Sequence, residues 1–105
     1  MMTQTQGVRQ CHSLTEVRAS IDDIDAQIVA LVAQRQGYVR QAAGFKQNLS
    51  EVPAPARVEA VIAKVVAQAQ RLGAQPEVVE AMYRAMIAAF IAYETKQHQA
   101  GRAES

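Results

Sequence analysis

The stretch from Leu14 to Lys46 constrains the fold of this chain more than any other. Apolar side chains recur in it at alternating steps of three and four residues, the pattern of a long amphipathic helix that packs against other helices. Arg35 occupies a position of this seam at which the pattern requires a hydrophobe. Because a buried, unpaired guanidinium is costly, we expect Arg35 to meet either a carboxylate of the protein or an anionic ligand. The apolar seam residues are Leu14, Val17, Ile21, Ile24, Ile28, Leu31, Tyr38, Ala42 and Phe45.

The long helix has a clear predicted start. Ser13 followed by Glu16 is a capping-box sequence, in which each side chain satisfies a free backbone N–H at a helix start. We therefore expect the helix to begin at Leu14 and to run about 50 Å to Lys46, at ~1.5 Å per residue. Residues 1–13 precede it as a predicted flexible segment.

Two shorter helices are predicted after the long one. The first covers about 55–72, opens on a proline and ends at Gly73, a residue that favours helix C-termini. The second covers about 76–98 and also opens on a proline. We therefore expect an all-α fold, with one helical domain over 14–98 and a flexible, polar tail over 99–105.

Composition and charge exclude several classes of protein. Lys+Arg (11) and Asp+Glu (10) nearly balance, so we expect no basic surface for nucleic acid or anionic lipid. No apolar run is long enough to span a membrane, and the N-terminal residues lack the apolar core of a signal peptide. The single cysteine, Cys11, cannot form a disulfide within the chain, so we expect a reduced, cytoplasmic setting. His12 and His98 have no partner at metal-ligand spacing, and no nucleophilic triad is present. We therefore expect no metal site and no nucleophilic catalysis.

The long helix cannot bury its whole seam within one short chain. A rod with an exposed apolar stripe associates, and a symmetric homodimer with antiparallel long helices is the simplest result. Arg18 and Arg35 are seventeen residues apart, roughly 25 Å along the helix axis, so they cannot hold one small metabolite within a chain. In the antiparallel dimer, Arg18 of one subunit would approach the Arg35 region of the other.

Four cations could converge on one helical cleft of this dimer. Arg18 and Arg35 are joined by Lys46 at the end of the long helix and Arg57 at the start of the next one. Such a cluster indicates a small dianion held by forked guanidinium–carboxylate contacts. A solvated surface charge is the alternative for Arg18, Lys46 and Arg57. For Arg35 the alternative is a structural ion pair with one of three carboxylates: Asp22, Asp25 or Glu94.

The segment Leu14–Lys46 resembles the first helix of the all-helical class of chorismate mutases. The resemblance rests on Arg18 just before the Ile-Asp-Asp-Ile-Asp run at Ile21–Asp25, on Arg35 within the seam, and on the closing Lys46. It extends over about residues 14–98. It implies an intertwined all-α homodimer with two active sites, each completed by Arg18 of the partner, and catalysis without a cofactor.

The same resemblance implies a substrate and a role for each site residue. The substrate would be a cyclohexadiene dicarboxylate with an enolpyruvyl ether, either chorismate or isochorismate. Arg18 and Arg35 would hold carboxylates, Lys46 a carboxylate and the ether oxygen, and Arg57 would close the loop side. Glu94 takes the place of a glutamine that donates to the ether oxygen in many members, so it would have to be protonated to do the same. The alternative for Glu94 is a solvated charge near a helix end.

One stretch separates two branches of this family. Val52–Val58 (VPAPARV) is similar to the isochorismate-pyruvate lyases of salicylate biosynthesis, and Val58 stands where typical mutases have a glutamate that contacts the ring hydroxyl. Glu94, by contrast, is also found in some fungal mutases. We therefore expect a chorismate mutase that forms prephenate, with an isochorismate-pyruvate lyase, which forms salicylate and pyruvate, as the alternative. A non-catalytic helical dimerisation module is the third interpretation.

Overall fold

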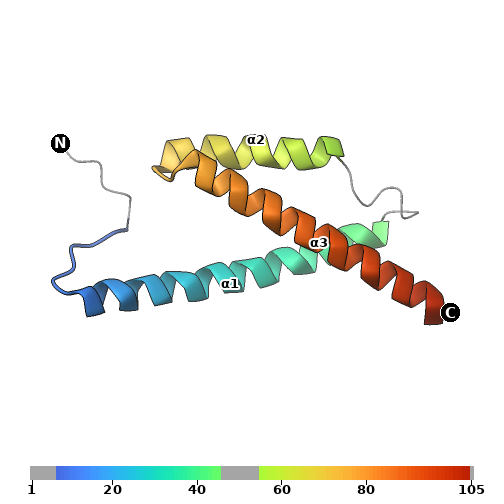
Figure 1. Ribbon diagram of the computed structural model, residues 1–105, viewed down its shortest axis with the longest axis horizontal. Helices are drawn as coiled ribbons and strands as arrows, with labels where there is room; N and C mark the ends of the chain where they lie inside the picture. The colour runs from blue at the N-terminus through green and yellow to red at the C-terminus, as the bar shows by residue number, and fades with distance from the viewer. Residues whose placement is uncertain (1–6, 46–54, 105) are drawn as a thin grey trace.

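The computed structural model of the chain describes residues 7–45 and 55–104. This part of the chain consists of three helices and contains no strand (Figure 1). They are α1 (Leu14–Phe45), α2 (Pro55–Leu72) and α3 (Pro76–Glu104). The predicted all-α class is therefore confirmed. None of these helices has a stretch both long enough and apolar enough to cross a membrane.

The start of α1 is the predicted capping box. The Ser13 hydroxyl oxygen accepts a hydrogen bond from the Glu16 backbone N–H at 3.1 Å. The Glu16 carboxylate accepts one from the His12 backbone N–H at 3.0 Å, one residue earlier than in the usual box. Two backbone donors that the helix itself cannot satisfy are paired in this way, which fixes the first helical residue as Leu14.

The turn between α2 and α3 follows the predicted glycine signal. Gly73 has a φ of 85°, a left-handed conformation that costs glycine little. The Ala74 N–H then donates to the Ala69 carbonyl at 2.9 Å, the bond of a Schellman C-cap. The Gln75 carbonyl accepts the first backbone hydrogen bonds of α3, so the chain reverses within a few residues.

The predicted end of the third helix, at about residue 98, is wrong because α3 continues to Glu104. The expectation rested on the polar composition of this segment. Polarity does not end a helix unless a proline or a capping residue is present, and Gly101 by itself costs only about 1 kcal/mol in a helix interior. Its neighbours Ala100 and Arg102 are good helix formers.

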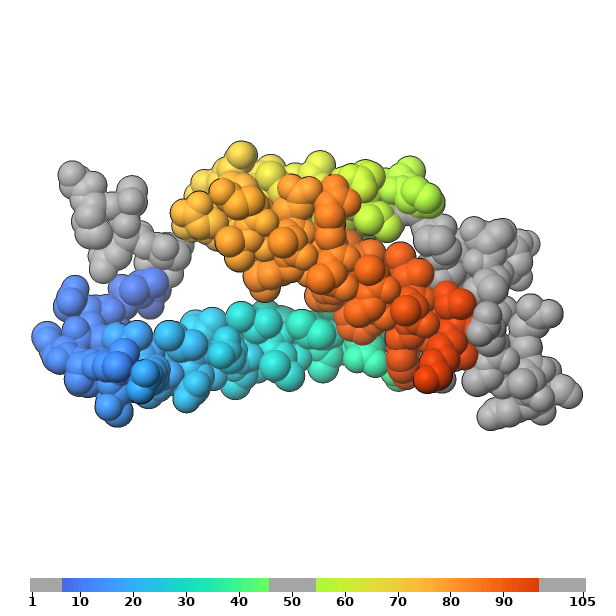
Figure 2. Space-filling view, viewed as in Figure 1, coloured from blue at the N-terminus to red at the C-terminus, as the bar shows by residue number. Residues whose placement is uncertain are grey.

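The hairpin of α2 and α3 contains the buried core of the chain. Among the described residues only Ile62, Val65, Ala69 and Ile87 are buried hydrophobes, and all of them lie on these two helices. The helix α1 approaches α3 only along its C-terminal half, while its N-terminal half extends away from the hairpin (Figures 1 and 2). Burial within one chain therefore stabilises the hairpin far more than it stabilises α1.

No residue of α1 is buried, and most of its seam is open to solvent. The seam residues Leu14, Ile21, Ile24 and Leu31 are each more than half exposed. The radius of gyration is 17.7 Å, whereas a compact chain of this length has about 13 Å. The single chain is therefore an elongated body that leaves an apolar helical stripe uncovered, as the sequence analysis expected.

Candidate active site

Arg35 lies where α1 meets α3, and its charge faces aromatic rings. Its guanidinium carbon is 6.0 Å from the ring centroid of Tyr83 and 6.0 Å from that of Phe90. Both rings belong to α3, and the side chain of Arg35 is half-buried between the helices. A guanidinium over an aromatic face at this distance is attracted by the negative charge of the ring face.

Within one chain, the described residues form none of the ion pairs considered for Arg35. Although Asp22, Asp25 and Glu94 are all described, none of them lies within ion-pair distance of this guanidinium; the ion pairs between described side chains are those of Arg84 with Glu59 and Glu80. The rings stabilise the charge without using a hydrogen-bond acceptor. The N–H donors of Arg35 therefore remain available for a planar anion such as a carboxylate.

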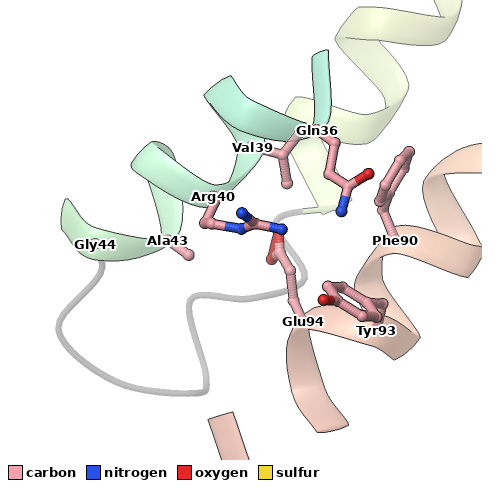
Figure 3. Close-up of a pocket in the computed structure, with 8 residues that line it drawn as sticks. All are labelled: Gln36, Val39, Arg40, Ala43, Gly44, Phe90, Tyr93 and Glu94. Atoms are coloured by element: carbon pink, nitrogen blue, oxygen red, sulfur yellow. The ribbon is translucent and has the colours of Figure 1, made fainter. Parts of the chain in front are cut away.

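A pocket of about 420 Å³ opens between the last turns of α1 and the second half of α3 (Figure 3). Arg40 extends into it from α1, and Glu94 and Tyr93 from α3. Phe90 lines this pocket and also contacts Arg35, so it connects the two sites. The lining residues are Gln36, Val39, Arg40, Ala43, Gly44, Phe90, Tyr93 and Glu94.

The five site residues predicted from the sequence fall into three groups. Arg35 and Glu94 both lie near Phe90: the guanidinium carbon of Arg35 is 6.0 Å from the Phe90 ring centroid, and Glu94 follows Phe90 by one helical turn and lines the pocket. Arg18 and Arg57 are exposed, on the N-terminal half of α1 and at the start of α2. No hydrogen bond or ion pair between described residues joins either of them to Arg35 or Glu94. Lys46 lies outside the described residues.

Gln36, Arg40 and Tyr93 line the pocket but were not predicted from the sequence. The prediction rested on the seam of large hydrophobes, whereas the face of α1 that packs within the chain is offset from that seam by one residue. The half-buried residues of this second face are Val32, Gln36, Val39 and Ala43, at steps of four, three and four. This spacing was visible in the sequence, but its mixture of small and polar residues made the signal weak.

Comparison with known families identifies the helical class. Residues 17–95 match the family described as chorismate mutase type II. The chain belongs to this family. The match begins in the first turn of α1 and ends in α3, and includes Arg18, Arg35, Arg57 and Glu94. The resemblance inferred from the seam and its cations is thereby confirmed.

A curated relative of this chain is named for the alternative reaction. It is the isochorismate pyruvate lyase of Pseudomonas aeruginosa, which is 34% identical over 86 residues. The alignment covers 82% of this chain and 85% of the relative. The similarity fits the lyase branch of the family without favouring it over the mutase reaction.

Proposed function

We propose that this protein is a chorismate mutase, which rearranges chorismate to prephenate without a cofactor. The observation that carries the proposal is Arg35, a guanidinium without a carboxylate partner among the described side chains, set between two aromatic rings in a chain of this family. A site that holds an unneutralised cation between helices is suited to an anionic ligand.

The pericyclic reaction requires no covalent participation of a protein side chain. One C–O bond breaks while one C–C bond forms, so no nucleophile is required. Positioning the two ends of the substrate and stabilising the negative charge that grows on the ether oxygen are sufficient. In this proposal Arg35 binds a carboxylate, and protonated Glu94 donates to the ether oxygen. Lys46 would add a second donor, and Arg57 would close the site from the start of α2.

We also propose that the active protein is an antiparallel homodimer in which Arg18 reaches the site of the partner subunit. The exposed seam of α1 supports this, because an apolar stripe of that length is costly in water. The position of Arg18 supports it too, since it lies roughly 25 Å from Arg35 along the same helix. One chain therefore cannot supply both arginines to one ligand.

Isochorismate pyruvate lyase is the second candidate. Val58, half-buried near the start of α2, favours it because an apolar side chain cannot accept a hydrogen bond from the ring hydroxyl of chorismate. The 34% identical relative of that name is consistent with this reading. Each candidate substrate carries two carboxylates and an enolpyruvyl ether, so one set of cations could hold either.

The deciding experiment compares the two substrates on pure protein. We expect turnover of chorismate to prephenate, and we would measure kcat/KM for it and for release of salicylate from isochorismate. A higher kcat/KM with isochorismate would assign the lyase. Turnover of neither would favour a non-catalytic helical dimerisation module. Val58→Glu provides an internal comparison, because it should shift the ratio of the two values towards chorismate.

A further inference from the structure

We infer that Tyr83 and Phe90 are positioning residues, which together orient the guanidinium of Arg35 for the carboxylate of the substrate. We refer to these two rings as the aromatic clamp. The inference rests on the proposed function, because it assigns Arg35 to substrate binding. It adds two residues of α3 that act on the reaction through Arg35.

The geometry of the aromatic clamp follows from helix periodicity. Tyr83 and Phe90 are seven residues apart, so they project from the same face of α3 about 10 Å apart along its axis. The guanidinium carbon of Arg35 is 6.0 Å from each ring centroid, so it lies between the two rings. A third residue of this face, Ile87, is buried in the core, which fixes the rotation of α3.

The aromatic clamp restricts the motion of the Arg35 side chain. Arginine has a long side chain with several rotatable bonds, and the loss of that freedom on binding reduces affinity. A carboxylate of the protein could fix Arg35, but it would occupy the N–H donors and neutralise the charge. Two aromatic rings hold the cation and leave its N–H donors available. The site is therefore preorganised for an anion before the anion arrives.

The kinetic test uses Tyr83, because Phe90 also lines the pocket and could touch substrate directly. Tyr83→Leu should lower kcat/KM by about tenfold, mainly through KM, because a freely moving Arg35 binds the carboxylate less well. Tyr83→Phe keeps the ring and should recover most of that loss. Should Tyr83→Leu fail to fold or dimerise, Tyr83→Met takes its place in the same series.

A double-mutant cycle separates positioning from general packing. In an Arg35→Gln background the aromatic clamp has no cation to orient, so Tyr83→Leu should change kcat/KM by less than about twofold. An equal tenfold loss in both backgrounds would overturn the inference, because the ring would then act independently of Arg35. Equal activity of Tyr83→Leu and the parent protein would overturn it as well.

A substrate-free measurement distinguishes failure of the aromatic clamp from failure of the proposed function. In ¹⁵N-labelled protein the Arg35 Nε–Hε signal, assigned by its loss in Arg35→Gln, should show a ring-current shift. This shift should decrease in Tyr83→Leu and persist in Tyr83→Phe. A protein inactive on both substrates would refute the proposed function, whereas an Arg35 signal insensitive to Tyr83→Leu would refute the clamp.

Discussion

Arg84 of α3 donates to both carboxylate oxygens of Glu59 on α2, from Nη1 at 2.9 Å and from Nη2 at 3.0 Å. Its Nε also donates to Glu80, one turn earlier on α3, at 2.9 Å. The guanidinium therefore joins the two helices of the hairpin in a forked geometry. This exposed ion pair joins α2 to α3 outside the core that contains Ile62 and Ile87.

This ion pair should make stability depend on pH in a defined direction. The hydrogen bonds from Arg84 lower the pKa of Glu59 below its ordinary value of 4.5, because they favour the ionised carboxylate. The stabilisation is therefore fully present above pH 4.5 and is lost as the pH falls through the lowered pKa. Glu59→Gln should reduce Tm by about 1–3 °C at pH 7, since both groups are exposed.

Thermal unfolding of the parent protein and Glu59→Gln between pH 3 and pH 8 provides the measurement. The difference in Tm should be constant near neutral pH and shrink below pH 4.5. It should also decrease at high salt, which screens exposed charges. A Tm difference that grows towards acid pH would contradict this account.

A charge on the α1 seam should separate the subunits. Ile24 is 52% exposed in the single chain, and in the dimer it would face the partner. Ile24→Glu should therefore yield a species near the 11.4 kDa chain mass, with mutase activity reduced by at least about a hundredfold. Sedimentation velocity measures the mass. Ala26→Glu is the matched control, because it places the same charge on the opposite face of α1. Dissociation by both variants, or by neither, would count against the seam as the interface.

Two inactive variants should restore each other if Arg18 acts across the dimer. Arg18→Ala and Arg35→Ala homodimers should both be nearly inactive. A mixed dimer has one site that combines the intact Arg18 of one chain with the intact Arg35 of the other, so about half of the parent activity should return. Tandem affinity tags isolate the mixed dimer for assay. A verified mixed dimer without activity would argue that both arginines serve the same chain.

Arg35 and Lys46 should differ in their effects on stability. Arg35→Met should lower kcat/KM by orders of magnitude, with about 2–4 kcal/mol of transition-state stabilisation lost. It should not lower Tm, because an apolar side chain at this seam position offsets the lost contacts between the guanidinium and the two rings. Lys46→Ala should reduce the rate similarly, without a gain in Tm. Retained activity in Arg35→Met would show that Arg35 has a structural role and does not bind the substrate.

Glu94 carries the most information about the reaction. Only a protonated carboxyl group can donate to the ether oxygen, whereas the amide of glutamine donates at every pH. Glu94→Gln has the same shape and should therefore raise kcat/KM at alkaline pH by about tenfold or more. Equal kcat/KM of the parent and Glu94→Gln at alkaline pH would show that Glu94 does not take part.

The sequence by itself determined the three helices, apart from the end of α3, and it indicated the cations that we propose for the site. Ser13 with Glu16, and Gly73 after the second helix, are signals whose hydrogen bonds are made within a few residues, so they act in any fold. The seam of α1 could also be predicted, because the spacing of its hydrophobes is a property of one helix. Arg35 was identified as an exception to that spacing without knowledge of the residues that it contacts.

Only the tertiary structure decided what those residues meet. Whether Arg35 faces a carboxylate or the rings of Tyr83 and Phe90 depends on how α3 is rotated relative to α1. That rotation is determined by the packing of side chains that are far apart in the sequence. The same rotation brought Arg40 into the pocket with Glu94, and placed the packed face of α1 one residue away from its seam. Local patterns fix where a helix begins and which residues share a face. They do not fix which face a neighbouring helix covers, because that is decided by packing between helices.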